Sequence, residues 1–246
     1  MSHSTPSIEQ YPAIILAGGL GTRLRSVVQD LPKPMAAING KPFLHYLFLF
    51  LTRQHIHHAI LCVGYKSKAI ESYFGDKYLD VKITYSHEEE PLGTGGAIQQ
   101  AFTLVTDKAF VLNGDTFFDI DLASLMHFAD EHEAALAMAL KPMQNFDRYG
   151  VVRTDEDGKI SAFEEKRWVE QGAINGGIYF TDKSVFSDKQ HLPKFSFEKE
   201  ILEQGVAQKR FYGKAFEHYF IDIGIPEDFA RAQHDFAQLF GLKFFE

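Results

Sequence analysis

Cysteine is almost absent: Cys62 is the single one in a chain of 246 residues. One cysteine excludes an intrachain disulfide, and its place in the apolar run 59–63 predicts a buried structural thiol rather than a nucleophile. Long apolar runs are lacking too, because no stretch approaches the roughly 18 residues of a membrane-spanning helix. The polar residues 1–10 have no apolar segment of signal-peptide type. We therefore expect a soluble, cytoplasmic protein with no membrane partner.

Positive charge is also scarce, with 25 Lys and Arg against 33 Asp and Glu and a formal net charge of -8. Sequence-independent nucleic-acid binding needs clustered Lys and Arg, so we expect no nucleic-acid partner. The eleven histidines show no His-x-x-x-His zinc spacing, and no Ser-His-Asp arrangement is evident. A phosphorylated small molecule is not excluded, because a local basic pocket can lie in an acidic protein.

The chain has enough apolar sequence for one large α/β domain, since 45% of it is hydrophobic and 14% aromatic. In the first half, short apolar runs alternate with segments of helical pattern. The strand candidates are 13–17, 59–63, 81–85 and 109–112, and the helix candidates are 42–54, 67–74, 95–104 and 122–132. This alternation is typical of βαβ units and a parallel, doubly wound sheet.

The second half changes character, with short strand candidates at 134–140, 150–153, 159–164 and 174–180. Asp155–Gly158 has the composition of a hairpin turn. Helices are predicted over 195–204 and 226–240, the second opened by Pro226. We therefore predict a disordered arm over 1–10 and a single domain over 11–246, whose first half ends near residue 133.

A glycine-rich segment, Leu16-Ala17-Gly18-Gly19-Leu20-Gly21-Thr22-Arg23-Leu24, follows the first predicted strand. Glycines let the backbone bend sharply and bring its N–H groups close to phosphates. The spacing differs from the dinucleotide fingerprint, because Thr22-Arg23 stands where a third glycine would open the helix; no Walker A sequence is present either. Arg23 adds bidentate donors suited to a polyphosphate. Taken alone, a structural turn with a surface arginine is the alternative.

A second basic residue, Lys33, lies between Pro32 and Pro34. Because the two prolines fix the backbone on both sides, the lysine is a positioned charge rather than a flexible surface group. In isolation the segment could be a solvated loop. Together with Arg23, it suggests two cations around a triphosphate and an incoming phosphate.

The stretch 13–42 resembles the signature of sugar-1-phosphate nucleotidyltransferases, and the similarity extends over residues 11 to 236. The resemblance implies a Rossmann-like, doubly wound mixed sheet with a small sugar-binding β extension and no left-handed β-helix domain. Its nucleotide-binding half is about 11–133 and its sugar-binding half about 134–246. Arg23 and Lys33 would be catalytic through positioning and charge. The phosphate loop would bind the nucleotide through Leu16, Ala17, Gly18, Gly19, Gly21 and Thr22.

The implied reaction is Mg²⁺-dependent attack of a sugar 1-phosphate oxygen on the α-phosphorus of a nucleoside triphosphate, with release of pyrophosphate. These two substrates are the expected partners, and a homo-oligomer is left open. The stretches 141–150, 195–199 and 221–228 most resemble the subgroup that transfers GMP from GTP to D-glycero-α-D-manno-heptose 1-phosphate. That subgroup makes GDP-heptose for a bacterial surface polysaccharide.

The segment 86–96 resembles the family's base-recognition loop, although its acidic run alone would be a solvated loop. Its glycines open a helix whose amide end can face an anionic or polar ligand. The resemblance places Glu88 against the base, where a carboxylate accepts from guanine N1–H and N2–H₂ together, or from uracil or thymine N3–H alone. It also assigns Pro91, Gly93 and Thr94 to the nucleotide. The string favours GTP, but uridylyltransferases can carry a similar loop.

Asp115 follows the buried strand candidate 109–112, at a carboxyl end where ligands bind in open α/β sheets. Its carboxylate is a hard oxygen ligand of the kind that Mg²⁺ prefers, with a helix-capping turn as the alternative. Asp222, in the segment 219–226, has the same pattern. Only the resemblance brings Asp115 and Asp222 together as metal ligands.

The sugar-phosphate site is implied by the resemblance of three short segments, which assign Gly150, Glu165, Lys166, Asn175 and Gly176. Without the resemblance, each would be an ordinary turn or strand end. Arg148 could join the phosphate site or form a surface ion pair. Two departures from the family pattern, at 25–28 and at Phe220-Ile221, change no proposed ligand.

Three rival interpretations stay open. Within the enzyme class, the rivals are a mannose-1-phosphate guanylyltransferase and a uridylyl- or thymidylyltransferase acting on another hexose 1-phosphate. A non-catalytic sugar-nucleotide sensor is disfavoured, because Arg23, Lys33, Asp115 and Asp222 are all present. A nicotinamide dehydrogenase is disfavoured by the spacing of the glycine loop.

Overall fold

A computed structural model describes residues 7–18, 31–64, 66–189, 192 and 194–241. Its centre is an eight-stranded sheet in the order β13-β9-β12-β7-β1-β4-β6-β5. The four strands predicted for the first half lie side by side and parallel, as β1 (Ala13–Leu16), β4 (His58–Val63), β6 (Val81–His87) and β7 (Lys108–Asn113). The predicted doubly wound layer is therefore confirmed in the first half of the chain.

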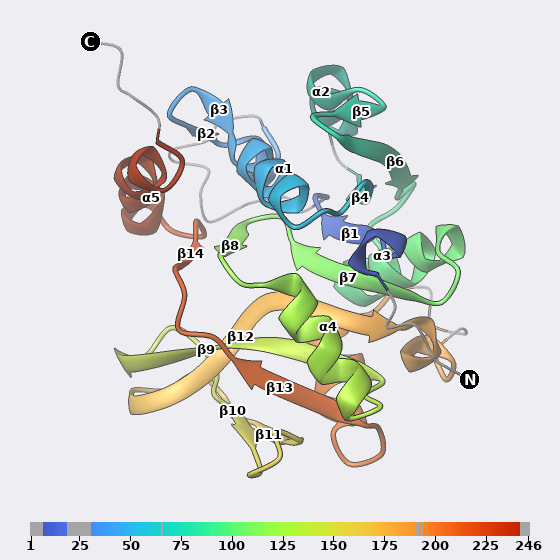
Figure 1. The fold of residues 1–246 in the computed structure, drawn as a ribbon, viewed down its shortest axis with the longest axis vertical. Coiled ribbons are helices and arrows are strands. Elements are labelled where there is room, and N and C mark those ends of the chain that lie inside the picture. Colours follow the sequence, from blue (N-terminus) through green and yellow to red (C-terminus); the bar gives the residue numbers. More distant parts are fainter. Residues whose placement is uncertain (1–6, 19–30, 65, 190–191, 193, 242–246) are drawn as a thin grey trace.

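The second half of the chain makes the sheet mixed. β12 (Val169–Asp182) is antiparallel to β7 and to β9 (Leu136–Phe146). β13 (Phe211–Ala215) is parallel to β9, and β5 (Lys77–Tyr78) is antiparallel to β6. This arrangement confirms the Rossmann-like mixed fold, with a β extension built from β9 and β12 (Figure 1).

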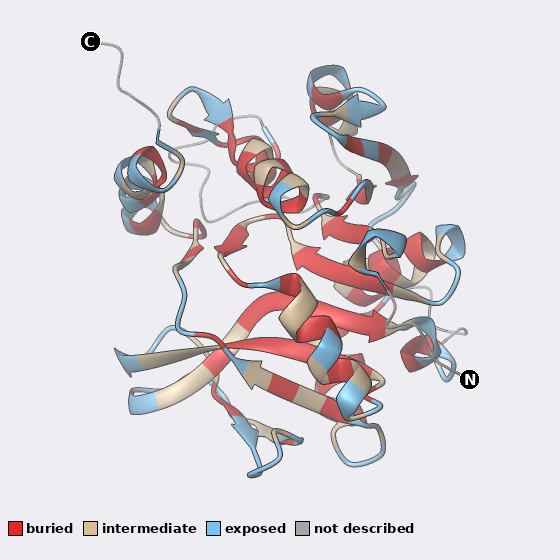
Figure 2. Cartoon of the chain, in the orientation of Figure 1, coloured by how far each residue is buried: buried red, intermediate tan, exposed pale blue. Residues whose placement is uncertain are grey.

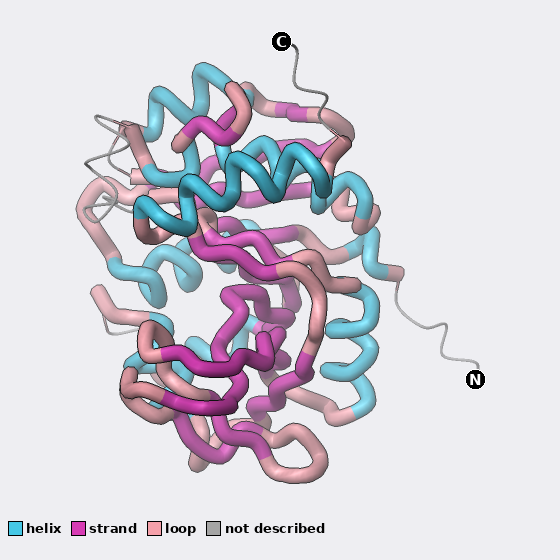
Figure 3. Tube along the Cα trace, turned by 90° about the vertical axis from the view of Figure 1, so that its left-hand side faces the viewer, coloured by secondary structure: helices cyan, strands magenta, loops and turns pink. Residues whose placement is uncertain are grey.

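Helices cover both faces of the sheet because neighbouring residues of each strand point to opposite faces. Ile15, Leu61 and Leu112 pack under α1 (Phe43–Arg53), α4 (Leu122–Glu131) and α5 (Pro226–Leu239), and Ile14, Ile60 and Val111 pack under α3 (Gly93–Ala101). The side view and the burial colouring show this layering, with α2 (Ser67–Phe74) beside β6 (Figures 2 and 3). Among the described residues, no helix has the length and apolarity to cross a membrane.

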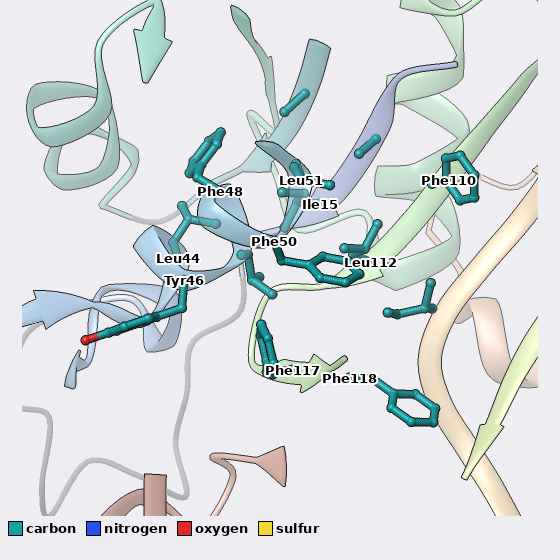
Figure 4. Packing of buried hydrophobic residues seen from close by; sticks show 14 of the residues in the cluster. Ile15, Leu44, Tyr46, Phe48, Phe50, Leu51, Phe110, Leu112, Phe117 and Phe118 are labelled. Carbon is teal, nitrogen blue, oxygen red and sulfur yellow. The ribbon is translucent and has the colours of Figure 1, made fainter. Parts of the chain in front are cut away.

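The core beneath α1 explains why that helix forms where it does. Its first, second, fourth and fifth residues, with three more farther along, are buried, and Phe43 and Tyr46 pack on Phe236 of α5. Figure 4 shows Phe50 of α1 reaching toward Phe117, and the two rings meet edge to face at 5.8 Å. The predicted helix 42–54 is confirmed because its apolar residues recur at helical spacing.

Small secondary elements join the main layers. β8 (Thr116–Phe118) pairs with β14 (Phe220–Asp222), β10 (Val152–Thr154) with β11 (Ile160–Phe163), and β2 (Ala37–Ile38) with β3 (Lys41–Pro42). The 3-10 helices of the described residues are η1 (Ile8–Gln10), η3 (Lys33–Met35), η4 (Phe102–Leu104) and η5 (Lys183–Phe186). In the predicted turn 155–158, the Asp155 carboxylate accepts from the N–H groups of Asp157 and Lys159, and Gly158 has φ +84°. The predicted hairpin is therefore confirmed.

The structure differs from the sequence-based expectations at three elements. Residues 8–10 of the expected disordered arm form η1, and Ile8 packs against the core. The strand predicted over 174–180 extends to 169–182, because its polar first part pairs with β9 as a two-stranded ribbon. The helix predicted over 195–204 is η6 (Phe197–Glu203), a π-helix.

Candidate active site

The candidate site lies at the carboxyl edge of the parallel strands. Leu16 pairs in register with Cys62 and Asn113, and Val63 pairs with His87, so the strands end at one level. Two hydrogen bonds continue the layer past the strands, from Ala17 N–H to the Cys62 carbonyl at 2.9 Å and from Gly114 N–H to the Leu16 carbonyl at 3.1 Å. This edge is where open α/β sheets bind ligands.

Two aspartates and a lysine meet at this edge. The Lys33 Nζ lies 2.6 Å from the Asp115 Oδ2, and only 11% of the lysine side chain is exposed. Asp222 is brought beside Asp115 by strand pairing, since Asp222 pairs with Thr116 in β14 and β8, and the Ile223 N–H donates to the Asp115 carbonyl at 3.0 Å. Burial raises the pKa of Asp222, and the negative charge of Asp115 raises it further, while Lys33 lowers it.

This pair of carboxylates fits a hard divalent cation. Asp222 Oδ1 is oriented by the Gly224 N–H at 2.7 Å. No group of three or more His, Cys, Asp or Glu side chains suited to a metal occurs in the part of the chain that the structure describes. Two carboxylates suit Mg²⁺, which commonly takes its remaining ligands from water and substrate phosphates.

Glu88, the carboxylate predicted to face the base, lies next to the start of the glycine-rich segment. Its Oε2 accepts from the Leu92 N–H at 2.9 Å, and a Cβ on Gly18 would lie 2.9 Å from its Oε1. The absence of a side chain at Gly18 therefore lets the carboxylate approach the loop. Desolvation raises the pKa of Glu88, partly opposed by the Leu92 hydrogen bond. The remaining loop predictions, Gly19, Gly21, Thr22 and Arg23, lie outside the described residues.

N–H groups in the first turn of α3 are hydrogen-bonded to another segment of the protein. The N–H groups of Gly95 and Gly96 both donate to the Phe195 carbonyl, at 3.0 and 3.4 Å. The expectation that the amide end of this helix faces a ligand is therefore wrong for these two groups. Gly93 has φ +73° and leaves no room for a side chain against Phe195. Pro91 is exposed on the preceding loop.

The predicted sugar-phosphate residues fall in two groups. Asn175 and Gly176 lie at a bulge of β12, where Asn175 Oδ1 accepts from the Gly177 N–H at 2.9 Å and Gly176 packs against Phe118 of β8. These residues are thereby next to the strand that follows Asp115. Glu165 and Lys166 are exposed in the loop between β11 and β12. That loop returns beside Gly150, whose Cα faces the Glu164 carbonyl.

The sequence did not decide between a phosphate-binding role and a surface ion pair for Arg148, and it did not identify the partner of this arginine. The Arg148 Nη1 lies 2.6 Å from the Asp228 Oδ2, and Asp228 is a buried residue that also contacts Arg231 at 3.0 Å. Arg148 therefore forms an ion pair with a buried carboxylate, and its positive charge also lowers the pKa of Asp222. Asp228 in the first turn of α5 could have been noticed as a helix-start acid, but its partner could not.

A Rossmann-like mixed sheet that ends in a lysine and two adjacent aspartates is the arrangement of a nucleotide-binding enzyme. The chain belongs to the nucleotidyl transferase family, which it matches over residues 12–238. It is a sugar-1-phosphate nucleotidyltransferase, as the sequence predicts.

Two named relatives and one solved structure are similar to most of the chain. The chain is 51% identical over 224 residues to D-glycero-alpha-D-manno-heptose 1-phosphate guanylyltransferase of Aneurinibacillus thermoaerophilus, covering 91% of this chain and 97% of the relative. It is 52% identical to the protein of the same name from Campylobacter jejuni, covering 88% and 96%. The crystal structure of HddC from Yersinia pseudotuberculosis complexed with GMP-PN superposes with a TM-score of 0.82 at 38% identity, covering 92% of this chain and 99% of that one.

Proposed function

We propose that the protein transfers GMP from GTP to D-glycero-α-D-manno-heptose 1-phosphate in a Mg²⁺-dependent reaction that gives GDP-heptose and pyrophosphate. The observation that carries nucleotidyl transfer is the contact of Lys33 with Asp115, beside Asp222, at the carboxyl edge of the sheet. The guanylyl donor and the heptose acceptor are supported by the names of two relatives at 51% and 52% identity.

The reaction requires one bond to form and one to break at the α-phosphorus. A phosphate oxygen of the sugar 1-phosphate attacks, and pyrophosphate leaves with the bridging oxygen and its electron pair. Asp115 and Asp222 would hold a Mg²⁺ ion, which supplies positive charge to the phosphates. Lys33 would place its ammonium group beside the reacting phosphates, and Arg23 would bind the triphosphate. These groups position the reactants and stabilise charge without forming covalent bonds.

Guanine selection is assigned to Glu88. Its Oε2 is already oriented by the Leu92 N–H, and its Oε1 points to the side on which the glycine loop begins. A carboxylate held in this way can accept from guanine N1–H and N2–H₂ together, whereas uracil and thymine offer only N3–H. The ionised form of Glu88 is therefore the guanine-binding form.

The acceptor is assigned to the sugar half. Asn175 and Gly176 at the bulge of β12, Gly150, and the exposed Glu165 and Lys166 would surround the sugar and its phosphate. Mannose 1-phosphate is the second candidate acceptor, because the chain is also 37% identical to mannose-1-phosphate guanylyltransferase of Mycobacterium tuberculosis. That match covers 92% of this chain and 64% of the relative.

The test is pyrophosphate release with Mg²⁺ across four nucleoside triphosphates and a panel of sugar 1-phosphates that includes the heptose and mannose. Release with GTP and heptose 1-phosphate, and much slower release with every other pair, is the expected result. A preference for UTP or dTTP would overturn the guanylyl assignment, and a preference for mannose 1-phosphate would overturn the acceptor. No release with any pair would favour a non-catalytic sensor.

A further inference from the structure

The segment 195–198 of the sugar half is seated on the first turn of α3 in the nucleotide half. The Phe195 carbonyl accepts from Gly95 and Gly96, and the Phe195 N–H donates to the Leu92 carbonyl at 3.0 Å. A side chain at Gly95 would overlap the Phe195 ring. The nucleotide loop that begins at Glu88 is therefore attached at its far end to a segment about a hundred residues later in the chain.

Glu198 is the charged group of this attachment. Its Oε2 accepts from the Thr94 hydroxyl and from the Ser196 hydroxyl, both at 2.8 Å. The Thr94 hydroxyl oxygen in turn accepts from the Phe197 N–H at 2.8 Å. Hydrogen bonds to a carboxylate are stronger than those between neutral groups. Thr94 is thereby held from both sides by the segment 195–198.

Phe197, the residue before Glu198, contacts the acceptor segment. Phe197 packs edge to face on Tyr179 at 5.1 Å between ring centres, and Tyr179 is fully buried. The Tyr179 hydroxyl accepts from the Asn175 side-chain amide at 2.6 Å. Burial raises the pKa of Tyr179, and the nearby negative charge of Glu198 adds to the shift. The adjacent residues Phe197 and Glu198 thus connect Thr94 with the Tyr179–Asn175 pair, because both contact Thr94 and Phe197 also packs on Tyr179.

The local backbone supports a functional reading of this segment. η6 is a seven-residue π-helix that begins one residue before Glu198. π-Helical turns are rare and are found frequently at functional sites. Among the described residues, the side chain of Glu200 in the same helix makes a local contact, accepting from the Ser196 N–H at 2.8 Å, and none with α3. The two glutamates of one helix therefore differ in whether they reach α3.

We infer that Glu198 is a positioning residue that fixes the nucleotide loop 88–94 relative to the acceptor segment 174–177 through Thr94 and Phe197. It acts through Thr94 and does not contact substrate. The inference rests on the proposed function, because it takes 88–94 as the nucleotide loop and 174–177 as part of the acceptor site. Its consequence is that binding of the nucleotide and binding of the sugar 1-phosphate are coupled through this bridge.

The experiment compares Glu198→Ala, Glu198→Gln, Thr94→Val and the double variant Glu198→Ala/Thr94→Val with the full-length wild type. Calorimetry gives the Kd of a non-hydrolysable GTP analogue, with and without the sugar 1-phosphate. Amide hydrogen exchange of residues 93–96, measured without substrate, shows whether the contacts of Thr94 with Glu198 and Phe197 hold this segment in place. Glu200→Gln is the matched control, because it changes a carboxylate of the same helix that does not reach α3.

We expect Glu198→Ala and Thr94→Val each to weaken analogue binding about ten-fold and to speed exchange at 93–96. The double variant should lose less affinity than the sum of the two single variants, because both substitutions remove the Thr94–Glu198 hydrogen bond. Glu198→Gln keeps an acceptor oxygen and should retain most of the wild-type affinity for the analogue. If Glu198→Ala does not fold, Thr94→Val still tests the inference. In kinetic assays, KM for GTP should rise more than kcat falls.

The inference is overturned if Glu198→Ala and Thr94→Val leave amide exchange at 93–96 at the wild-type rate. It is also overturned if their effects on the Kd of the GTP analogue are additive, or if Glu200→Gln weakens binding as much as Glu198→Ala. The proposed function is tested by a different result, since wild-type protein that binds no guanine nucleotide would refute the assigned donor. Amide exchange at 93–96 would still test the contacts of Thr94 with Glu198 and Phe197.

Discussion

The two halves of the site are supported by different kinds of secondary structure. In the proposed nucleotide half, β1, β4, β6 and β7 are parallel, Glu88 directly follows β6, and Asp115 lies two residues after the end of β7. In the acceptor half, Asn175 and Gly176 lie at an irregularity of the antiparallel pair β9–β12, and Glu165 and Lys166 lie on an exposed loop. A parallel layer fixes its ends by burial, whereas an exposed loop can vary with little cost to the fold.

We therefore expect the proposed nucleotide half to determine catalysis and the choice of nucleotide. We expect the proposed acceptor half to determine the choice of sugar 1-phosphate. Changes at the strand ends should abolish or redirect catalysis. Changes on the acceptor loop should alter acceptor affinity and leave nucleotide binding intact.

The largest effect is expected at Asp115. Asp115→Asn replaces one of the two proposed carboxylate ligands with a neutral amide and removes the charge that pairs with Lys33, so kcat with Mg²⁺ should fall by about 10²–10³-fold or more. Steady-state pyrophosphate release measures the loss, and circular dichroism checks the fold. Asp119→Asn is the matched control, because Asp119 follows the same strand pair but forms an ion pair with Arg53. Normal turnover by Asp115→Asn would refute its role as a ligand.

A loss of similar kind and smaller size is expected at Lys33. Lys33→Ala should lower kcat by about 10²-fold, because a positioned charge beside the phosphates is lost. Its removal also takes away one of the positive charges near Asp222, which should raise the pKa of Asp222 further. Thermal melting separates the two roles: a fall in Tm of only a few degrees agrees with catalysis, whereas a large fall with unchanged kcat per folded molecule would indicate a structural lysine.

Donor selection should change at Glu88 while the acceptor site is unaffected. Glu88→Gln should lower kcat/KM for GTP by about 10–100-fold relative to UTP, since a carboxamide cannot accept two donors as a carboxylate does. Glu89→Gln, at the exposed neighbouring residue, is the control. Equal losses with all nucleotides would contradict a role in reading the base.

The same residue predicts a pH dependence. Burial raises the pKa of Glu88, so the proton is bound more tightly in the folded protein than in the unfolded chain. As pH falls through this raised pKa, the guanine-binding carboxylate is lost and KM for GTP should rise, while folding stability gains from the bound proton. Measurement of KM between pH 4 and pH 8 for the wild type and Glu88→Gln should show this rise in the wild type alone.

The smallest effect is expected on the exposed acceptor loop. Lys166→Ala should raise KM for the sugar 1-phosphate by about ten-fold, the loss of roughly one charge-assisted contact, and leave nucleotide binding and Tm unchanged. Lys159→Ala on the neighbouring hairpin is the matched control. If Lys166→Ala weakens nucleotide binding as much as acceptor binding, the two halves are not separable in the way proposed.

Local sequence patterns were sufficient for the main helices and strands of the first half of the chain and for one hairpin turn of the second half. Helical spacing predicted α1 and α4, apolar runs predicted β1, β4, β6 and β7, and Asp and Gly predicted the turn at 155–158. These features depend on interactions within a few residues, so periodicity and turn chemistry report them directly. The same patterns failed for the first part of β12, whose polar residues form a strand only because β9 lies beside them.

What only the tertiary structure decided is which distant residues meet. Asp115 and Asp222 are adjacent because β8 pairs with β14, Arg148 reaches Asp228 of α5, and the first turn of α3 is occupied by the Phe195 carbonyl. The sequence by itself determined the residue types at the strand ends and hence the chemistry available there. Their convergence depends on the pairing of strands about a hundred residues apart, and that pairing depends on burial and packing of the whole core rather than on any local signal.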